Sequence, residues 1–174
     1  PKITYNAILV KVAATALRLH PRINASVESD TIKVWRQIHI GVAVDTEEGL
    51  LVPVVKNPDT KSIKEINQEL TELTTKARDK SLLPDDLANG TFTISNLGSA
   101  DIDFFTPILR PPESALLGVG RIVEKPVVKN GQIASETRLA LSLTIDHRII
   151  DGAPGARFLK TIKAIIEDPL LIIS

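Results

Sequence analysis

The 174-residue chain contains no cysteine, which excludes disulfide bonds, thiolate metal sites and a cysteine nucleophile. Aromatic residues make up only 3% of the chain, and its 21 basic residues balance its 21 acidic ones, so the formal net charge is zero. No basic cluster with interleaved aromatic residues occurs, and we therefore expect no nucleic-acid partner. No apolar run is long enough to span a bilayer, so we expect no membrane segment either.

Hydrophobic residues make up 43% of the sequence, which is enough for a substantial core. The length suits a single domain, and we take residues 1–174 as one unit. The sequence opens at Pro1 without a signal-like segment and passes directly into an amphipathic stretch.

Three helices are predicted from apolar residues at helical spacing. The first covers about residues 5–19, with Thr4 as its N-cap and Pro21 ending it. Ser62 and Glu65 form a capping-box pattern at the start of the second, whose single apolar stripe favours packing on a sheet with one side in solvent. The third covers Gly152–Glu167, with Pro154 near its first turn. Its buried stripe is expected to be Phe158, Leu159, Ile162, Ile165 and Ile166.

Strands are predicted between these helices, and the Asn-Gly pair at 130–131 is a strong hairpin signal between the last two of them. The order of helices and strands predicts an α/β fold built on a mixed β-sheet. The expected strands are Thr31–Trp35, Ile38–Val44, Leu50–Val55, Thr91–Ser95, Ala115–Val128 and Ile133–Ile145.

His147 is the best candidate for a general base. It follows an alternating strand, residues 139–145, that places leucine and isoleucine on one face and small or polar residues on the other. A histidine at a strand end is held rigidly and can face a cleft. Its imidazole can take a proton from a thiol or hydroxyl near neutral pH. A histidine beside an aspartate is also a common structural pair, so the pattern by itself leaves both interpretations open.

The other two histidines lack this setting. His20 precedes a proline and is expected to end the first helix, whereas His39 lies in an alternating strand and is expected at a surface or interface. No metal is expected at Asp146, His147 and Asp151, because three residues so close at one strand end surround an ion poorly.

The segment Asp146-His147-Arg148-Ile149-Ile150-Asp151-Gly152 resembles the Asp-His-Arg-x-x-Asp-Gly signature of the dihydrolipoyl acyltransferases. These enzymes form the core of 2-oxo acid dehydrogenase complexes. Four further segments resemble motifs of that family in the expected order, so the resemblance covers nearly the whole chain. It implies a mixed β-sheet sandwich with helices, similar to chloramphenicol acetyltransferase. The four segments are residues 21–26, 45–55, 92–98 and 111–120.

The resemblance implies transfer of an acyl group between coenzyme A and a dihydrolipoyl group carried by a separate domain. Such a reaction needs a base for the thiol proton and a donor for the oxyanion. His147 matches the family's base, and Ser95 matches its oxyanion donor, although Ser95 alone would be read as a turn-capping hydroxyl. Asp151 matches the second acidic position of the signature. It could assist the base directly or form a structural ion pair with Arg148 or a neighbouring chain, and we expect the ion pair, because a carboxylate against the imidazole favours imidazolium.

Asp45, Asn96 and Gly120 match positions near the family's coenzyme A channel. Asp45 is equally suited to a hairpin turn. A nucleotide-loop interpretation of Gly118-Val119-Gly120 is weak, since a third glycine and a following helix are lacking.

The resemblance also implies assembly. The family's active site lies between the subunits of a trimer, with the base and the serine on different chains, so we expect a homo-oligomer built from trimers. The apolar end, residues 168–174, would plug contacts between trimers or fold back on its own sheet. Lipoyl and partner-binding domains, and an opening strand and helix with an arginine for coenzyme A, are expected before residue 1. The partners would be a 2-oxo acid decarboxylase and dihydrolipoyl dehydrogenase, in the cytoplasm or, in a eukaryote, the mitochondrial matrix.

Two alternatives remain: a free acetyltransferase of the chloramphenicol type, and a core scaffold without catalysis. The Asp-His-Arg and Pro-Pro-Glu motifs favour the complex-bound enzyme over the first, and the presence of both His147 and Ser95 argues against the second. Residues 99–105 replace a glycine-rich stretch found in many relatives close to the acyl pocket. We expect an acetyl or branched-chain acyl group rather than succinyl, because Arg110 is the only basic residue near that segment.

Overall fold

The computed structural model describes residues 2–172. The helices are α1 (Tyr5–Leu19), α2 (Ile63–Arg78), α3 (Pro84–Leu87) and α4 (Gly152–Glu167), with short 3-10 turns η1 (Pro21–Ile23), η2 (Pro58–Thr60), η3 (Gly98–Ala100) and η4 (Pro169–Ile172). The strands are β1 (Ala25–Glu28), β2 (Thr31–Val34), β3 (His39–Val42), β4 (Val44–Thr46), β5 (Gly49–Leu51), β6 (Val54–Lys56), β7 (Phe92–Asn96), β8 (Ala115–Val119), β9 (Val123–Lys129), β10 (Gln132–Arg138) and β11 (Leu141–Ile145).

The caps of the first two long helices are those expected from the sequence. The side chain of Thr4 accepts the Ala7 N–H at 3.3 Å, and α1 ends at Leu19 with His20 as its C-cap. Ser62 and Glu65 form the expected capping box: the Ser62 hydroxyl accepts the Glu65 N–H, and Glu65 accepts the Ser62 N–H at 2.7 Å. Each contact satisfies a backbone donor that a helix leaves free at its N-terminus.

A five-stranded mixed sheet forms the centre of the molecule, in the order β11-β8-β7-β3-β6. The three middle strands run parallel to one another, and the edge strands β6 and β11 run antiparallel to their neighbours. The mixed α/β class expected from the sequence is therefore confirmed.

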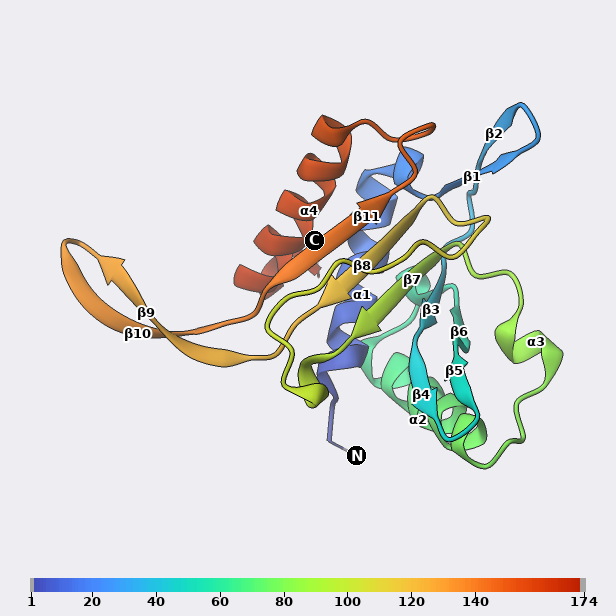
Figure 1. Cartoon of the computed structure of the whole chain (residues 1–174), viewed down its shortest axis with the longest axis horizontal. Helices are drawn as coiled ribbons and strands as arrows, with labels where there is room; N and C mark the ends of the chain where they lie inside the picture. The colour runs from blue at the N-terminus through green and yellow to red at the C-terminus, as the bar shows by residue number, and fades with distance from the viewer. Residues whose placement is uncertain (1, 173–174) are drawn as a thin grey trace.

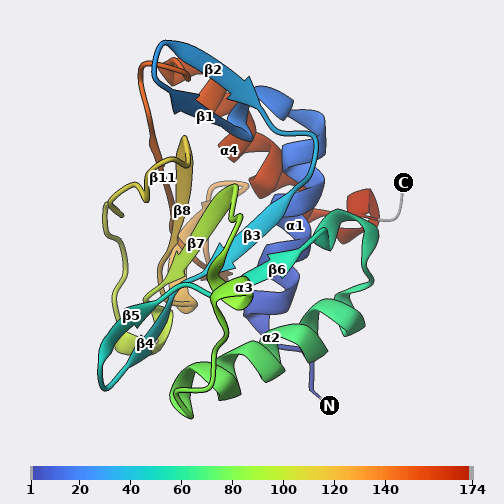
Figure 2. The same cartoon turned by 90° about the vertical axis from the view of Figure 1, so that its right-hand side faces the viewer.

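The two faces of this sheet differ. One face packs against the long helices, as in the contact between the Phe92 and Phe158 rings, whose centroids are 5.7 Å apart. The opposite face carries the alternate residues, among them Ser95, Gly118 and Ser142. Figure 2 shows α1 and α2 on one side of the sheet and the yellow-green segment after β7 on the other. Ser95 therefore lies on the face without helices.

The β9–β10 hairpin projects from the body as a two-stranded arm (Figure 1). Its residues Val128 and Ile133 are 74% and 83% exposed. The Asn-Gly turn at its tip confirms the hairpin expected from the sequence. Among residues 2–172, no helix is both long and apolar enough to cross a membrane.

Several expected strands are shorter than predicted. The stretches predicted as Ile38–Val44, Leu50–Val55, Ala115–Val128 and Ile133–Ile145 each break where the chain leaves the central sheet. β1 was not predicted, because its four residues carry little apolar alternation. At the C-terminus, Ile172 packs against the core and Leu170 is 72% exposed; the rest of the expected plug, residues 173–174, lies outside the described residues.

The prediction for His39 was wrong. Its side chain is buried in β3, where Nδ1 accepts the N–H of Asn57 at 3.2 Å. Burial lowers the pKa of His39, so the neutral ring is the form that suits this acceptor role.

Candidate functional site

Four of the residues expected at the active site lie at one end of the central sheet. Ser95 and Asn96 end β7, Gly120 follows β8, and Asp45 lies in β4, directly after β3. Because β3, β7 and β8 run parallel, their carboxyl ends meet at the same edge. The hydrogen bond from the Ala43 N–H to the Ile94 carbonyl, at 2.9 Å, holds the start of β4 beside β7.

Ser95 is half-buried on the sheet face that no helix covers. It pairs in register with Gly118 of β8, which in turn pairs with Ser142 of β11. Within residues 2–172 its hydroxyl has no hydrogen-bond partner, so it is free to donate to a ligand. The turn-capping role that Ser95 alone would suggest is therefore not seen within residues 2–172.

Asn96 and Gly120 shape the turn after Ser95. The Asn96 amide donates to Asn6 at 2.7 Å, and its carbonyl accepts the Gly98 N–H at 2.9 Å. A β-carbon on Gly120 would lie 2.0 Å from the carbonyl oxygen of Asp103. Both residues therefore stabilise the local backbone, in addition to any contact that they make with a ligand.

Asp45 lines a cavity of about 540 Å³ between the β4–β5 hairpin and the end of α2. Lys80 in this cavity already pairs with Glu48 at 2.5 Å. Arg78 has no carboxylate partner among residues 2–172, so its guanidinium is available to an anion. The cavity can thus accept a phosphate group at Arg78, although its acidic residues leave it without a surplus of positive charge.

His147 lies in the loop between β11 and α4, at the other end of the sheet. The loop is fixed at its base, where the Asp146 N–H donates to the Ser114 carbonyl at 2.8 Å and the Ile150 N–H donates back to Asp146 at 3.0 Å. The His147 side chain itself is 73% exposed. The ends of the loop are fixed and its imidazole is exposed. This arrangement suits a side chain that must meet a substrate or a second chain.

Arg148 pairs with Asp146, and this corrects the expected ion pair between Arg148 and Asp151. The guanidinium lies 2.6 Å from Asp146 Oδ2, and its hydrogen bonds hold the pKa of that carboxyl below its ordinary value. Asp151 is instead the N-cap residue of α4, with its Oδ1 3.8 Å from His147 Nδ1. The predicted pairing of Arg148 with Asp151 was wrong, because a tight turn that the sequence pattern did not reveal brings Arg148 close to Asp146 instead. A partner for Asp151 on a neighbouring chain stays a prediction.

Ser95 and His147 are far apart within one chain. Ser142, the residue in register with Ser95, lies three residues before the end of β11, and His147 lies beyond that end. At about 3.3 Å per residue, β11 alone carries the chain ~10 Å away from the row that contains Ser95. A single chain therefore does not bring the two groups together.

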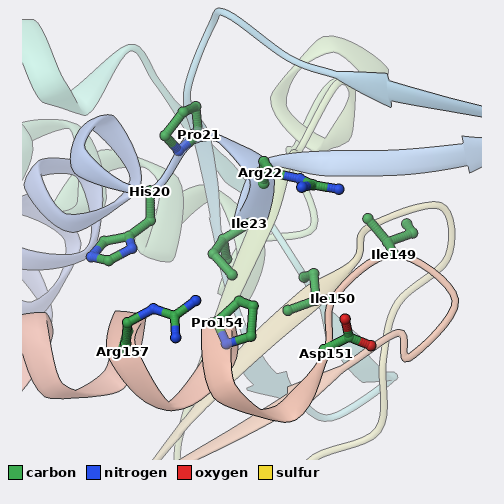
Figure 3. A pocket seen from close by; sticks show the side chains of 9 residues that line it. All are labelled: His20, Pro21, Arg22, Ile23, Ile149, Ile150, Asp151, Pro154 and Arg157. Carbon is green, nitrogen blue, oxygen red and sulfur yellow. The ribbon is translucent and has the colours of Figure 1, made fainter.

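A cavity of about 350 Å³ lies between η1, the first turns of α4 and the loop that precedes α4 (Figure 3). The side chains of Ile149 and Ile150 line it from the loop. The C-cap residue of α1, His20, Arg22 of η1 and Arg157 of α4 line its other side. Burial, and then the positive charge of Arg157, lower the pKa of His20. His20 Nε2 also bonds Thr161 at 2.8 Å, so this ring ties α1 to α4.

Sequence reasoning gave no role to Glu113, although it belongs to the Pro-Pro-Glu motif. Its carboxyl is buried; one oxygen pairs with Arg110 at 3.2 Å, and the other has no hydrogen-bond partner among residues 2–172. Burial raises the pKa of Glu113. Within residues 2–172, no group of three or more histidine and acidic side chains is arranged to hold a metal ion.

The chain matches the family model of the 2-oxoacid dehydrogenases acyltransferase catalytic domain over residues 1–174. It is 47% identical to the dihydrolipoyllysine-residue acetyltransferase component of the pyruvate dehydrogenase complex of Bacillus subtilis, over 99% of this chain and 39% of that protein. The identity to the same component of Staphylococcus epidermidis is 45%, over 99% of this chain and 40% of that protein. The chain thus spans about two fifths of the length of these relatives.

Solved structures give the same result. Dihydrolipoamide acetyltransferase of Azotobacter vinelandii superposes with a TM-score of 0.96 at 39% identity, over 99% of this chain and 72% of that one. A structure of the cubic core of the pyruvate dehydrogenase multienzyme complex matches with the same values. Chloramphenicol acetyltransferase, at a TM-score of 0.57 and 16% identity over 90% of this chain and 76% of that one, shares the fold alone.

For the Azotobacter acetyltransferase, the role of a serine, a histidine and an asparagine in the catalytic mechanism has been investigated. The histidine lies 52 residues after the serine, and the asparagine lies 4 residues after the histidine. The same spacings separate Ser95, His147 and Asp151 in this chain, with aspartate in place of asparagine.

Proposed function

The chain belongs to the family of 2-oxoacid dehydrogenase acyltransferase catalytic domains, and from this premise we propose that it transfers an acetyl group between a dihydrolipoyl group and coenzyme A. The single observation that carries the proposal is the pair of Ser95 and His147 at the spacing of the catalytic serine and histidine in the Azotobacter acetyltransferase. The acetyl group is favoured over a branched one by the relatives that are named acetyltransferases of pyruvate dehydrogenase.

The site is completed between subunits of a trimer. Ser95 and His147 lie at opposite ends of the sheet, so each needs a partner from another copy. Three copies can form a ring in which the His147 end of one chain meets the Ser95 end of the next. This head-to-tail, heterologous contact closes after three copies and makes three equal sites. The exposure of the His147 side chain in the single chain supports this arrangement, since that surface is left for a neighbour.

His147 acts as the general base. With Nδ1 facing Asp151, Nε2 is left to take the proton from the coenzyme A thiol. The sulfur attacks the carbonyl carbon of the acetyl-dihydrolipoyl thioester, and the carbonyl oxygen becomes an oxyanion. The intermediate collapses by breaking the bond from carbon to the dihydrolipoyl sulfur, which takes the proton back from His147. The products are acetyl-CoA and the free dihydrolipoyl thiol, and no oxidant is consumed.

Ser95 stabilises the tetrahedral intermediate. Its hydroxyl has no hydrogen-bond partner among residues 2–172, so it can donate a hydrogen bond to the oxyanion without breaking a contact there. A donor held in place before the reaction costs no reorganisation when the charge develops. Asp151 has a supporting role: it is the N-cap residue of α4, and its carboxylate lies 3.8 Å from His147 Nδ1, at the end of the loop that carries the base.

Coenzyme A reaches Ser95 from the end of the sheet that carries Asp45, Asn96 and Gly120. The cavity beside Asp45 contains the guanidinium of Arg78, which has no carboxylate partner in the described part of the chain and can hold a phosphate group of the cofactor. The dihydrolipoyl group arrives on a separate domain, as the resemblance to the family implies; the chain spans about two fifths of the length of its relatives, which leaves room in them for such a domain. We place the catalytic domain over residues 1–174.

The same proposal covers assembly. We infer a homo-oligomeric core built from trimers, working with a 2-oxo acid decarboxylase and dihydrolipoyl dehydrogenase in the cytoplasm, or in the mitochondrial matrix if the source is a eukaryote. The similarity to the cubic core of a pyruvate dehydrogenase complex supports this assembly.

The test is transfer of acetyl from acetyl-CoA to dihydrolipoamide by the complete gene product, with wild type, His147→Ala and Ser95→Ala compared. Loss of the base is expected to lower kcat by about 10²–10⁴-fold. Loss of the oxyanion donor is expected to lower it by about 10²–10³-fold. Size-exclusion chromatography must show the same assembly for all three proteins.

Chloramphenicol serves as the control acceptor. Transfer to chloramphenicol but not to dihydrolipoamide would identify a free acetyltransferase instead. A wild-type protein that assembles but transfers acetyl to neither acceptor would point to a scaffold without catalysis.

A further inference from the structure

Asn96, the residue after Ser95, holds the end of β7 from the helix side of the sheet. Successive side chains of a strand point to opposite faces, so Ser95 and Asn96 lie on opposite sides of the sheet. Ile94 shares the face of Asn96 and belongs to the core that the helices cover, as does Val119, the residue in register with Asn96. Contacts of the Asn96 side chain therefore fix β7 without occupying the face on which Ser95 is expected to work.

Both polar atoms of the Asn96 amide have partners. Nδ2 donates to Asn6 Oδ1, in the first turn of α1, at 2.7 Å. Oδ1 accepts the Gly98 N–H at 2.9 Å, which closes a turn directly after the strand. The bond to Gly98 is local. Among the hydrogen bonds of residues 2–172, the bond to Asn6 is thus the one that joins the Asn96 side chain to a different element of the fold.

Asn6 is itself held in place, because the start of α1 is anchored to α2. The backbone N–H and the hydroxyl of Thr4 donate to Asn67 Oδ1 at 2.9 Å and 3.0 Å. Asn67 is 2% exposed, and its amide donates to the Lys2 carbonyl at 3.3 Å. These contacts lie within one helical turn of Asn6. A side chain on an anchored helix holds its partner more precisely than one on a loop.

We propose that Asn6 is a positioning residue for acyl transfer, which through Asn96 keeps the end of β7 in the geometry from which Ser95 donates to the oxyanion. This inference rests on the proposed function, since it takes Ser95 as that donor. The Ser95 hydroxyl has no hydrogen-bond partner among residues 2–172, so its position depends on the backbone that carries it. An oxyanion donor must lie about 2.7–3.1 Å from the oxygen. A displacement of about 1 Å can lower the rate by about 10²-fold.

The experiment separates the hydrogen bond from the bulk of the side chain. The complete gene product, as wild type, Asn6→Leu and Asn6→Asp, is assayed for acetyl transfer from acetyl-CoA to dihydrolipoamide, with assembly checked by size-exclusion chromatography. Leucine has a similar size but accepts no hydrogen bond, and we expect it to lower kcat by about 10- to 100-fold. Aspartate keeps the acceptor oxygen and should retain kcat within about threefold of wild type. KM for both substrates should stay within about twofold, because the lost interaction forms only in the transition state.

A double-mutant cycle tests whether Asn6 acts through Ser95. In a Ser95→Ala background the donor is already absent, so adding Asn6→Leu should lower kcat by less than about twofold. A residue that only supports the fold would lower kcat by the same factor in both backgrounds.

Tyr5→Leu is the matched control. It changes the neighbouring position of the same helical turn, but the Tyr5 side chain is 67% exposed, so kcat should stay as in wild type. If Asn6→Leu does not assemble, the same comparisons made with Asn6→Ala decide.

Four results would overturn the inference: an unchanged kcat in assembled Asn6→Leu, an equal loss in Asn6→Asp, a full further loss in the Ser95→Ala background, or an equal loss in Tyr5→Leu. A wild type that transfers no acetyl group to dihydrolipoamide would overturn the proposed function, and this inference with it. An active wild type, with a large loss in Ser95→Ala and none in Asn6→Leu, would overturn the inference alone.

Discussion

His147 Nδ1 lies 3.8 Å from Asp151 Oδ1, and the two side chains are 73% and 83% exposed. This separation is longer than a hydrogen bond, and water screens the attraction between groups so exposed. Within one chain the carboxylate therefore holds the imidazole only weakly. The Azotobacter relative, with an asparagine at the equivalent spacing, lacks the negative charge there altogether.

Asp151→Asn is therefore expected to cost little activity. The Asp151 side chain makes no cap hydrogen bond to α4, and asparagine is as well suited to an N-cap position as aspartate, so α4 should keep its start. We predict a loss of less than about tenfold in kcat/KM for acetyl transfer, against about 10²–10⁴-fold for His147→Ala. Steady-state kinetics on the two variants checks this. A loss as large as that of His147→Ala would mean that the charge of Asp151 acts directly in the reaction.

Gly120 is predicted to tolerate no side chain. A β-carbon there would lie 2.0 Å from the Asp103 carbonyl oxygen, which is backbone and can yield only by moving the whole segment. We expect Gly120→Ala to lower the free energy of unfolding by about 1–3 kcal/mol in urea denaturation.

The control for Gly120→Ala is Gly152→Ala at the start of α4, where an added β-carbon meets no atom within 4 Å. Alanine is the better helix former, so this variant should be neutral or stabilised by up to about 1 kcal/mol. Equal destabilisation of both variants would contradict the close approach at Gly120.

Glu113 should make the stability of the protein depend on pH. Burial raises its pKa in the folded state above the value in the unfolded chain, although Arg110 opposes the shift. The folded protein then binds the proton more tightly, so the contribution of Glu113 to the free energy of unfolding falls as pH rises from the ordinary glutamate pKa through the raised one. Glu113→Gln has no such proton to lose.

The free energies of unfolding of wild type and Glu113→Gln, measured between pH 4 and pH 7, check this. We expect the wild type to lose stability relative to Glu113→Gln as pH rises. Glu72→Gln, at an exposed position of α2, is the control for a substitution without burial. A difference that stays flat or grows in favour of the wild type would contradict the prediction.

Helices were predictable from the sequence because their signals are local. Thr4, and the pair Ser62 and Glu65, make the cap contacts within three residues of themselves. Strand ends were not predictable: residues 115–128 were predicted as one strand, whereas β8 ends at Val119, where the chain leaves the central sheet, and β9 begins at Val123. His39 was misplaced for the same reason: alternation shows which residues share a face, but only the tertiary structure decides which face is covered.

The candidate site, too, could be predicted only in part from the sequence. The motifs located Ser95 and His147, yet nothing local in the sequence shows that they lie at opposite ends of the sheet. The close approach of Phe105 to β8 depends on the missing side chain of Gly118, which is 13 residues away in the sequence. The Arg148 pairing depended on a turn geometry that brings it to Asp146 rather than to Asp151.

The central claim is that each active site takes His147 from one chain and Ser95 from another. It is tested most directly by co-expressing His147→Ala and Ser95→Ala chains and measuring acetyl transfer by the mixed trimers. In a ring of three with random mixing, about one quarter of the interfaces join an intact His147 to an intact Ser95, so about a quarter of wild-type activity should return. Mixed trimers that remain as inactive as the two single variants would show that both groups act within one chain, and would contradict the account.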